Sequence, residues 1–265
     1  MPIIDFRGAA IYYESSGTGH PIVLIPGFAS GIWNWSWQAD LASEFQVITF
    51  DPRGIGRSIS GDLSSLSLDL FTDDVLLILD DLDIEKAHIV GASFGGFVAL
   101  EFALKQPERV DKLILACTSA GGPEHVSPDI EILRSFTRDP NITLGEQIRR
   151  FFRPAFTERF HEEHPEIVEA LCRAREANDV SDETYLAQLT TAVSFNVADR
   201  LHEIEHKTLV LTGDSDKLVP MQNSVNLAAK LPNARLEIIE NGSHMFFVER
   251  AELFNKTVSN FLSGR

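Results

Sequence analysis

The sequence predicts an α/β fold, with a mostly parallel central sheet that is flanked by helices and interrupted by a helical insertion. Short β-rich apolar runs alternate with helical patterns as far as Ala116. The runs Ile22–Ile25 and Leu113–Ala116 are apolar at every position, which is typical of parallel strands that helices cover on both faces. The alternation stops after Ala116 and resumes at Thr208. We therefore expect one α/β core with a segment inserted into it.

Each predicted strand is a short apolar run bounded by turn residues. In chain order these runs are Ile11–Glu14, Ile22–Ile25, Val47–Phe50, Ala87–Gly91, Leu113–Ala116, Thr208–Leu211 and Arg235–Ile239. The first strands are able to form an antiparallel edge, a common variation in large sheets. The predicted helices lie near Trp35–Ala42, Ser67–Leu82, Phe94–Lys105, Met221–Leu231 and Glu249–Leu262.

The inserted segment, residues 121–199, has no convincing strand pattern and is helical, charged and rich in phenylalanine. We expect it to form a helical cap on a core made of residues 1–120 and 200–265. Packing inside the cap is the more common role for its phenylalanines, because phenylalanine is usually buried. Lining of a substrate pocket is the alternative, and Phe152 is its candidate.

Composition excludes several classes of protein. The chain has 265 residues and a formal net charge of −16, and such a surface repels nucleic acids and anionic membranes. No apolar run approaches the roughly 20 residues of a membrane span, and residues Met1–Asp5 lack the layout of a signal peptide. The two cysteines, Cys117 and Cys172, have no metal-like or redox-like spacing, which favours a reducing compartment, the cytoplasm.

No cofactor or metal is expected from the motifs. The glycine-rich stretch Gly54–Gly56 lacks the third glycine of a dinucleotide-binding loop. His161 and His164 are three residues apart, whereas the zinc-protease pattern needs a spacing of four. We interpret the histidine pair as part of a solvated helix end.

The residues Gly91-Ala92-Ser93-Phe94-Gly95 form a G-x-S-x-G motif between a predicted strand and a predicted helix. In that context the serine lies on a tight turn with its hydroxyl exposed, and small neighbours let the strand and the helix pass close together. A structural turn serine is the alternative, because the pentapeptide alone is a weak pattern. The flanking strand and helix favour Ser93 as a nucleophile.

A neutral serine needs a base, and the base needs an orienting acid. In the chain order that accompanies this motif, the acid follows the serine and a histidine comes last. Among the eight histidines, only His244 lies beyond the loop that follows the strand Thr208–Leu211. That loop contains both Asp214 and Asp216, and chemistry alone leaves both open as the acid.

Backbone N–H groups are expected to form the oxyanion hole. One donor is the residue after the nucleophile, Phe94, and the second comes from the loop after an earlier strand. Here that loop is Pro26-Gly27-Phe28, so Phe28 N–H is the expected second donor. A plain strand-to-helix turn is the alternative interpretation.

Taken together, these motifs resemble the α/β-hydrolase superfamily, in the broad group of small esterases and lactonases, over nearly the whole chain. The loop Asp51–Ser58 is similar to the family's loop before the nucleophile strand, where an arginine braces neighbouring loops. The stretch Gly213–Pro220 matches the family's acid loop, G-x-x-D-x-x-x-P, and the match implies Asp216 as the acid. His244 followed by Glu249 and Phe254 matches the C-terminal pattern.

The chain also departs from the family pattern. Pro26-Gly27 stands where the family usually has His-Gly, although backbone donation survives that change. Relatives that cleave carbon–carbon bonds carry asparagine before the serine and an aromatic residue after the histidine. Here Ala92 and Met245 occupy those positions, which counts against that activity. The dehalogenases and epoxide hydrolases of this fold place aspartate where this chain has Ser93.

The resemblance implies hydrolysis of a small carboxylic ester through an acyl-enzyme, with Ser93, His244 and Asp216 as the catalytic residues. The alternatives are an enol-lactonase or carbon–carbon hydrolase of aromatic-degradation products, and a ligand-binding module with little turnover. Trp33 and Met245 are further candidates for the substrate pocket, although core packing is the more common role of the tryptophans. Acyl-chain length, leaving group and stereopreference depend on the cap, and the sequence leaves the oligomeric state open.

Overall fold

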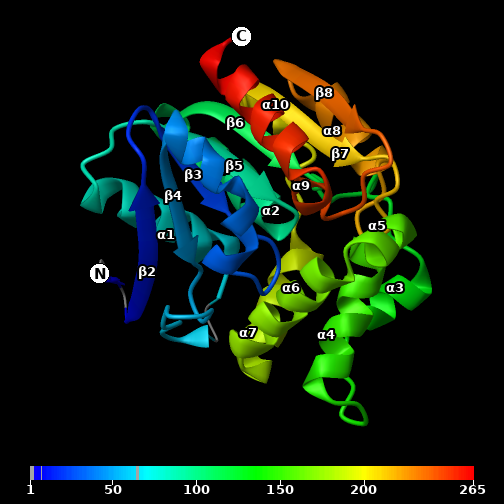
Figure 1. Cartoon of the computed structure of the whole chain (residues 1–265). Helices are drawn as coiled ribbons and strands as arrows, with labels where there is room; N and C mark the ends of the chain where they lie inside the picture. Colours follow the sequence, from blue (N-terminus) through cyan, green and yellow to red (C-terminus); the bar gives the residue numbers. More distant parts are fainter. Residues whose placement is uncertain (1–2, 7, 64–65) are drawn as a thin grey trace.

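The computed structural model describes residues 3–6, 8–63 and 66–265. Within these residues one eight-stranded sheet runs through the molecule in the order β1-β2-β4-β3-β5-β6-β7-β8 (Figure 1). The pairs β1–β2 and β2–β4 are antiparallel, and all the others are parallel. The strands are β1 (Ile3–Phe6), β2 (Ala9–Ser16), β3 (Pro21–Ile25), β4 (Gln46–Asp51), β5 (Ala87–Ala92), β6 (Val110–Ala116), β7 (Lys207–Gly213) and β8 (Ala234–Ile239).

The fold prediction is confirmed, including the antiparallel edge. All seven predicted strands are present as β2 to β8. The strand β1 was not predicted, because its four residues are too few for a clear alternation. Met1 and Pro2, which entered the interpretation of the N-terminus, lie outside the described residues.

Helices connect the strands. They are η1 (Ile32–Ser43), α1 (Leu68–Asp81), α2 (Phe94–Lys105), α3 (Ile130–Ser135), α4 (Leu144–Phe152), α5 (Glu158–Glu163), α6 (Pro165–Ala177), α7 (Asp182–Ser194), α8 (Gln222–Lys230), α9 (Phe246–Glu249) and α10 (Ala251–Ser263). Short 3-10 turns occur as η3 (Pro107–Arg109), η4 (Arg153–Ala155) and η5 (Leu201–Glu203). The predicted helix near Trp35–Ala42 is the 3-10 helix η1, and the last predicted helix is divided into α9 and α10.

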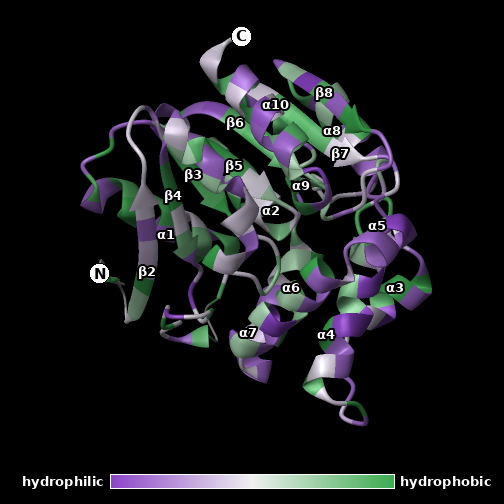
Figure 2. Cartoon of the chain, in the orientation of Figure 1, coloured by the Kyte–Doolittle hydropathy of each residue, from purple (hydrophilic) through white to green (hydrophobic). Residues whose placement is uncertain are grey.

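The sheet is buried on both faces, and this explains its continuous apolar runs. Along β3, Val23 and Ile25 pack in a core shared with α1, α2 and α8. Ile22 and Leu24 pack in a second core on the opposite face, together with η1, α9 and α10. Figure 2 accordingly shows the inner strands as mostly hydrophobic. Both alternating sets of side chains must therefore be apolar.

The order of the strands determines where a site is able to form. From β3 the chain moves to β4 on one side, and it later returns to β5 on the other side of β3. Loops that leave the carboxyl ends of two such strands diverge and open a crevice between them. The loop after β3 and the turn after β5, which contains Ser93, are these two connections.

Between β6 and β7 lies the helical insert, which contains α3 to α7 and lies beside the sheet (Figure 1). Its two ends meet in an isolated antiparallel bridge between Gly121 and Asn196. A hydrogen bond from Val197 N–H to the carbonyl of Ala120, at 2.9 Å, continues that bridge. The insert therefore leaves and re-enters the core at nearly one point.

The loop between β4 and α1 is held by a buried ion pair. Arg53 is 2% exposed, and its Nε donates to the Asp74 carboxylate on α1 at 2.9 Å. Nη2 of Arg53 contacts the other carboxylate oxygen and donates to the carbonyl of Leu70 at 3.0 Å. This arginine braces neighbouring elements, in agreement with the structural role expected for its loop.

Two further features concern membrane-spanning helices and the cysteines. No helix in the described part of the chain is long and apolar enough to cross a membrane. Cys117 and Cys172 are both buried and unpaired, and they do not form a disulfide with each other.

Replacing Arg53 by methionine is expected to lower the free energy of unfolding by about 3 kcal/mol, because it leaves the Asp74 carboxylate buried without its partner. Urea unfolding followed by circular dichroism measures the change. Arg134→Met is the matched control, since the Arg134–Glu131 pair is solvent-exposed and such pairs contribute little. Equal stability of the two variants would contradict a bracing role for Arg53.

Candidate active site

Ser93 lies on a strained turn between β5 and α2. Its backbone has φ 54° and ψ −119°, a conformation that non-glycine residues rarely adopt. Two hydrogen bonds hold the turn against the end of β6: Ser93 N–H donates to the Ala116 carbonyl at 2.9 Å, and Thr118 Oγ1 donates to the Ser93 carbonyl at 2.8 Å. The strain is therefore fixed by the surrounding sheet.

The glycines after Ser93 allow a close approach of backbones. A Cβ atom at Gly95 would lie 2.2 Å from the carbonyl oxygen of Ile25, at the end of β3. A Cβ atom at Gly96 would lie 2.4 Å from Oγ1 of Thr118. No larger residue fits at either position without displacing its neighbours, so α2 begins directly against the ends of β3 and β6.

His244 is paired with Asp216, in the loop after β7. His244 Nδ1 lies 2.9 Å from Oδ2 of Asp216, and both residues are buried. The other carboxylate oxygen, Oδ1, accepts hydrogen bonds from the N–H groups of Leu218 at 2.9 Å and Val219 at 2.8 Å. Asp214 is exposed and accepts a hydrogen bond from the Ser215 hydroxyl. Of the two aspartates, only Asp216 contacts the histidine.

The loop that carries His244 is fastened to the helical insert. Glu249 accepts hydrogen bonds from Ser243 N–H at 2.8 Å and from Thr157 N–H at 2.6 Å. The carbonyl of Ala155 accepts from the Ser243 hydroxyl at 2.6 Å and from Met245 N–H at 2.9 Å. The position of the histidine therefore depends on the insert as well as on the sheet.

Ser93 and His244 line the same small cavity, of about 40 Å³. The cavity lies between the carboxyl ends of the strands and the insert, and most of its wall is apolar. The wall includes Phe28, Phe136, Phe151, Phe152, Leu218, Met245 and Phe247. Among the described residues, no hydrogen bond connects the Ser93 hydroxyl to His244.

The residues of the two expected oxyanion donors, Phe28 and Phe94, lie near the serine turn. Phe28 lines the cavity, and a Cβ atom at the preceding Gly27 would lie 3.5 Å from Cβ of Ser93. Phe94 is the first residue of α2, where a backbone N–H has no partner within the helix. Within the described residues neither N–H donates a hydrogen bond.

Two of the three predicted pocket residues, Phe152 and Met245, line the cavity, whereas Trp33 does not. Trp33 packs against the core on the side of the sheet that η1 covers, and its role in a substrate pocket stays a prediction. Asn34 faces the cavity instead, and Trp35 packs on the Phe247 ring at 5.2 Å between centroids.

Sequence reasoning missed Asn34 as a site residue. It is 3% exposed, it lines the cavity, and its side-chain amide makes no hydrogen bond with any described residue. It is therefore a polar side chain in a mostly apolar wall. The sequence offers no signal for it beyond its position between the tryptophans Trp33 and Trp35.

Cys117 is next to the site but is a poor nucleophile. Complete burial raises the pKa of its thiol well above the usual value, and the negative charge of Asp216 raises it further. The thiol is therefore neutral at physiological pH, and the thiolate is the reactive form of cysteine.

Comparisons with known proteins agree with this architecture. A family model described as alpha/beta hydrolase fold matches residues 20–251. A protein of Caulobacter segnis assigned as carbamate hydrolase RutD is 32% identical, and the match covers 96% of this chain and 97% of that protein. A 2-hydroxy-6-oxononadienedioate/2-hydroxy-6-oxononatrienedioate hydrolase of Burkholderia vietnamiensis is also 32% identical, over 95% of this chain and 90% of that protein.

A solved structure of similar shape is Est816, described as an N-acyl homoserine lactone degrading enzyme. It is 28% identical to this chain, with a TM-score of 0.82, and the match covers 98% of this chain and all of that one.

Proposed function

The chain belongs to the α/β-hydrolase fold family and is a hydrolase, and from this premise we propose that it cleaves small carboxylic esters through a covalent acyl-enzyme on Ser93. The observation that carries the proposal is the buried His244–Asp216 pair, at 2.9 Å, beside a cavity that Ser93 also lines. A serine, a histidine and a buried acid in this arrangement are the components of nucleophilic acyl transfer.

In the proposed mechanism His244 is the general base. A carboxylate only accepts hydrogen bonds, so Nδ1 of His244 carries the proton that is donated to Asp216. The lone pair is then on Nε2, which removes the Ser93 proton as the hydroxyl attacks the carbonyl carbon. Hydrogen bonds between a nucleophile and its base are often formed only in the substrate complex.

The N–H groups of Phe28 and Phe94 would bind the oxyanion of the tetrahedral intermediate. Each such donor contributes about 10²–10³ in kcat in enzymes of this chemistry, because the negative charge develops only in the transition state. His244 then protonates the leaving alkoxide. The same residue activates the water that releases the acid product and regenerates Ser93.

The insert is proposed to act as a cap that selects the substrate. Phe136, Phe151 and Phe152 contribute an apolar wall to a small cavity, which suits a compact acyl group. Asn34 adds one polar contact. The unpaired, buried cysteines favour the cytoplasm as the place of action.

Cleavage of a carbon–carbon bond or of a lactone is the second candidate. It is favoured by the similarity to the Burkholderia vietnamiensis hydrolase and to Est816. Ala92 and Met245 argue against carbon–carbon cleavage, but the amide of Asn34 supplies a polar group in the cavity from another position. The same serine chemistry also attacks a carbamate carbonyl, the group named for the Caulobacter relative.

Ser93→Ala is expected to lower kcat for 4-nitrophenyl acetate by about 10⁶-fold, because the variant has no nucleophile. Release of 4-nitrophenol measures turnover, and mass spectrometry after treatment with a fluorophosphonate locates the modified residue. Substantial activity in the purified variant would refute the assignment. A wild-type chain that remains unlabelled would favour a binding module with little turnover.

Asp216→Asn is expected to lower kcat by about 10⁴-fold, because the amide no longer stabilises the imidazolium or fixes the required tautomer. Asp214→Asn is the matched control and should retain nearly full activity, since the Asp214 side chain is exposed and does not contact His244. The opposite ranking of the two variants would transfer the role to Asp214.

A panel of substrates should separate the candidate reactions. We expect short-chain aryl and alkyl esters to have the highest kcat/KM, about tenfold or more above that of lactones, aryl carbamates and vinylogous diketones. Differences in the contacts that one pocket makes with its substrates change kcat/KM by about that factor. Initial rates at substrate concentrations below KM give the comparison. A strong preference for a lactone or a diketone would assign the enzyme to the second candidate.

A further inference from the structure

A cluster of two histidines and one aspartate lies where three central strands begin, whereas Ser93 lies where one of these strands ends. His20 directly precedes β3, while His88 and Asp111 are the second residues of β5 and β6. These three strands are adjacent and parallel, so their first residues meet at one edge. Ser93 follows the last residue of β5 and is therefore at the other end of the same strand.

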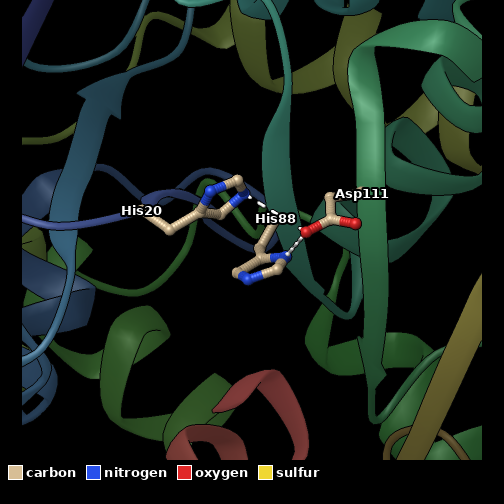
Figure 3. A group of neighbouring side chains, drawn as sticks. All are labelled: His20, His88 and Asp111. Atoms are coloured by element: carbon tan, nitrogen blue, oxygen red, sulfur yellow. Dashed lines mark ion pairs between the residues drawn. The ribbon is translucent and has the colours of Figure 1, made fainter. Parts of the chain in front are cut away.

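The side chains of the cluster converge. Both imidazoles point toward the Asp111 carboxylate (Figure 3). His20 Nε2 and His88 Nδ1 each lie 3.3 Å from Oδ2 of Asp111, and one ligand atom from each residue lies within 4.8 Å of the other two. Two atoms bound to one tetrahedral zinc ion at about 2.0–2.1 Å are about 3.4 Å apart. The two nitrogen-to-oxygen separations, at 3.3 Å, are thus close to those in a zinc ligand set.

His88 supplies an independent observation. It is 3% exposed, and its buried Nδ1 has no hydrogen-bond partner among the described residues, although it lies 3.3 Å from Oδ2 of Asp111. A buried polar nitrogen without a partner is uncommon and calls for an explanation. A metal ion coordinated by Nδ1 provides one.

The sheet is irregular at this point. The register of the β5–β6 pair shifts there, so that His88 on β5 lies opposite two residues of β6, Asp111 and Lys112. Such irregularities re-aim side chains. The neighbouring Lys112 ammonium donates to the carbonyls of Phe261 at 3.2 Å and Leu262 at 2.6 Å, so its hydrogen bonds are made outside the cluster.

We propose that His20, His88 and Asp111 bind one Zn²⁺ ion, with water at the fourth position. Two imidazole nitrogens and one carboxylate oxygen suit this borderline ion better than Mg²⁺ or Ca²⁺, which prefer oxygen ligands. His20 is half-exposed, so the ion has access from solvent and room for a water ligand. The acidic surface, with a net charge of −16, favours the approach of a cation.

The bound ion would stabilise the fold without entering the reaction. It joins the beginnings of three central strands, and the native arrangement of its ligands is lost when the chain unfolds. At a Zn²⁺ concentration about 100 times the Kd, we expect the melting temperature to rise by about 5 °C, and EDTA should reverse the rise. The hydrolysis rate should not change, because the site is at the opposite edge from Ser93.

Isothermal titration of the EDTA-treated full chain with ZnCl₂ tests the proposal. We expect one Zn²⁺ per chain, and His20→Ala or Asp111→Asn should weaken binding by about tenfold or more. Both side chains are partly exposed, so the variants are expected to fold. Four-coordinate Co²⁺ at the site would add visible absorption bands that these variants lose.

The matched control is the double variant His161→Ala, His164→Ala, which removes the histidines of the exposed helix end. It should bind Zn²⁺ as the wild type does. The proposal is overturned if wild-type protein binds no Zn²⁺, or if binding survives both His20→Ala and Asp111→Asn. Loss of binding in the control variant, with retention in the other two, would assign the ion to the helix end instead.

Discussion

The close crossing of α2 over the ends of β3 and β6 is the constraint on which the rest of the structure depends. The crossing requires glycine at positions 95 and 96, and it forces Ser93 into a backbone conformation with positive φ. Strain of this kind persists only where the surroundings over-determine it. Here a sheet buried on both faces and two hydrogen bonds between Ser93 and the residues at and just after the end of β6 supply that rigidity.

The sheet positions two of the three proposed catalytic residues, but the third depends on the insert as well. The sheet positions Ser93 and Asp216, whereas the loop of His244 is fastened to the insert through Glu249 and the carbonyl of Ala155. The insert also provides part of the apolar wall of the cavity. Changes in the insert would therefore alter the proposed base and the substrate pocket together, although the insert contains none of the three proposed catalytic residues.

The parts that could be predicted from the sequence are those with a local pattern. Continuous apolar runs marked the buried strands, and the G-x-S-x-G context marked the turn at Ser93. The distinction between Asp214 and Asp216 needed either family spacing or coordinates, because both lie in one loop. The His20–His88–Asp111 cluster was invisible in the sequence, because only strand pairing brings such distant residues together.

The bridge between Gly121 and Asn196 holds the two ends of the insert together. Because both ends of the insert meet there, a longer or shorter segment costs the fold little more than a change in loop-closure entropy, which grows slowly with length. The contacts of the insert set a second requirement, because any replacement segment has to supply the hydrogen bonds that Thr157 and Ala155 form with the loop of His244. The backbone connection therefore tolerates changes in length that the contact surface does not.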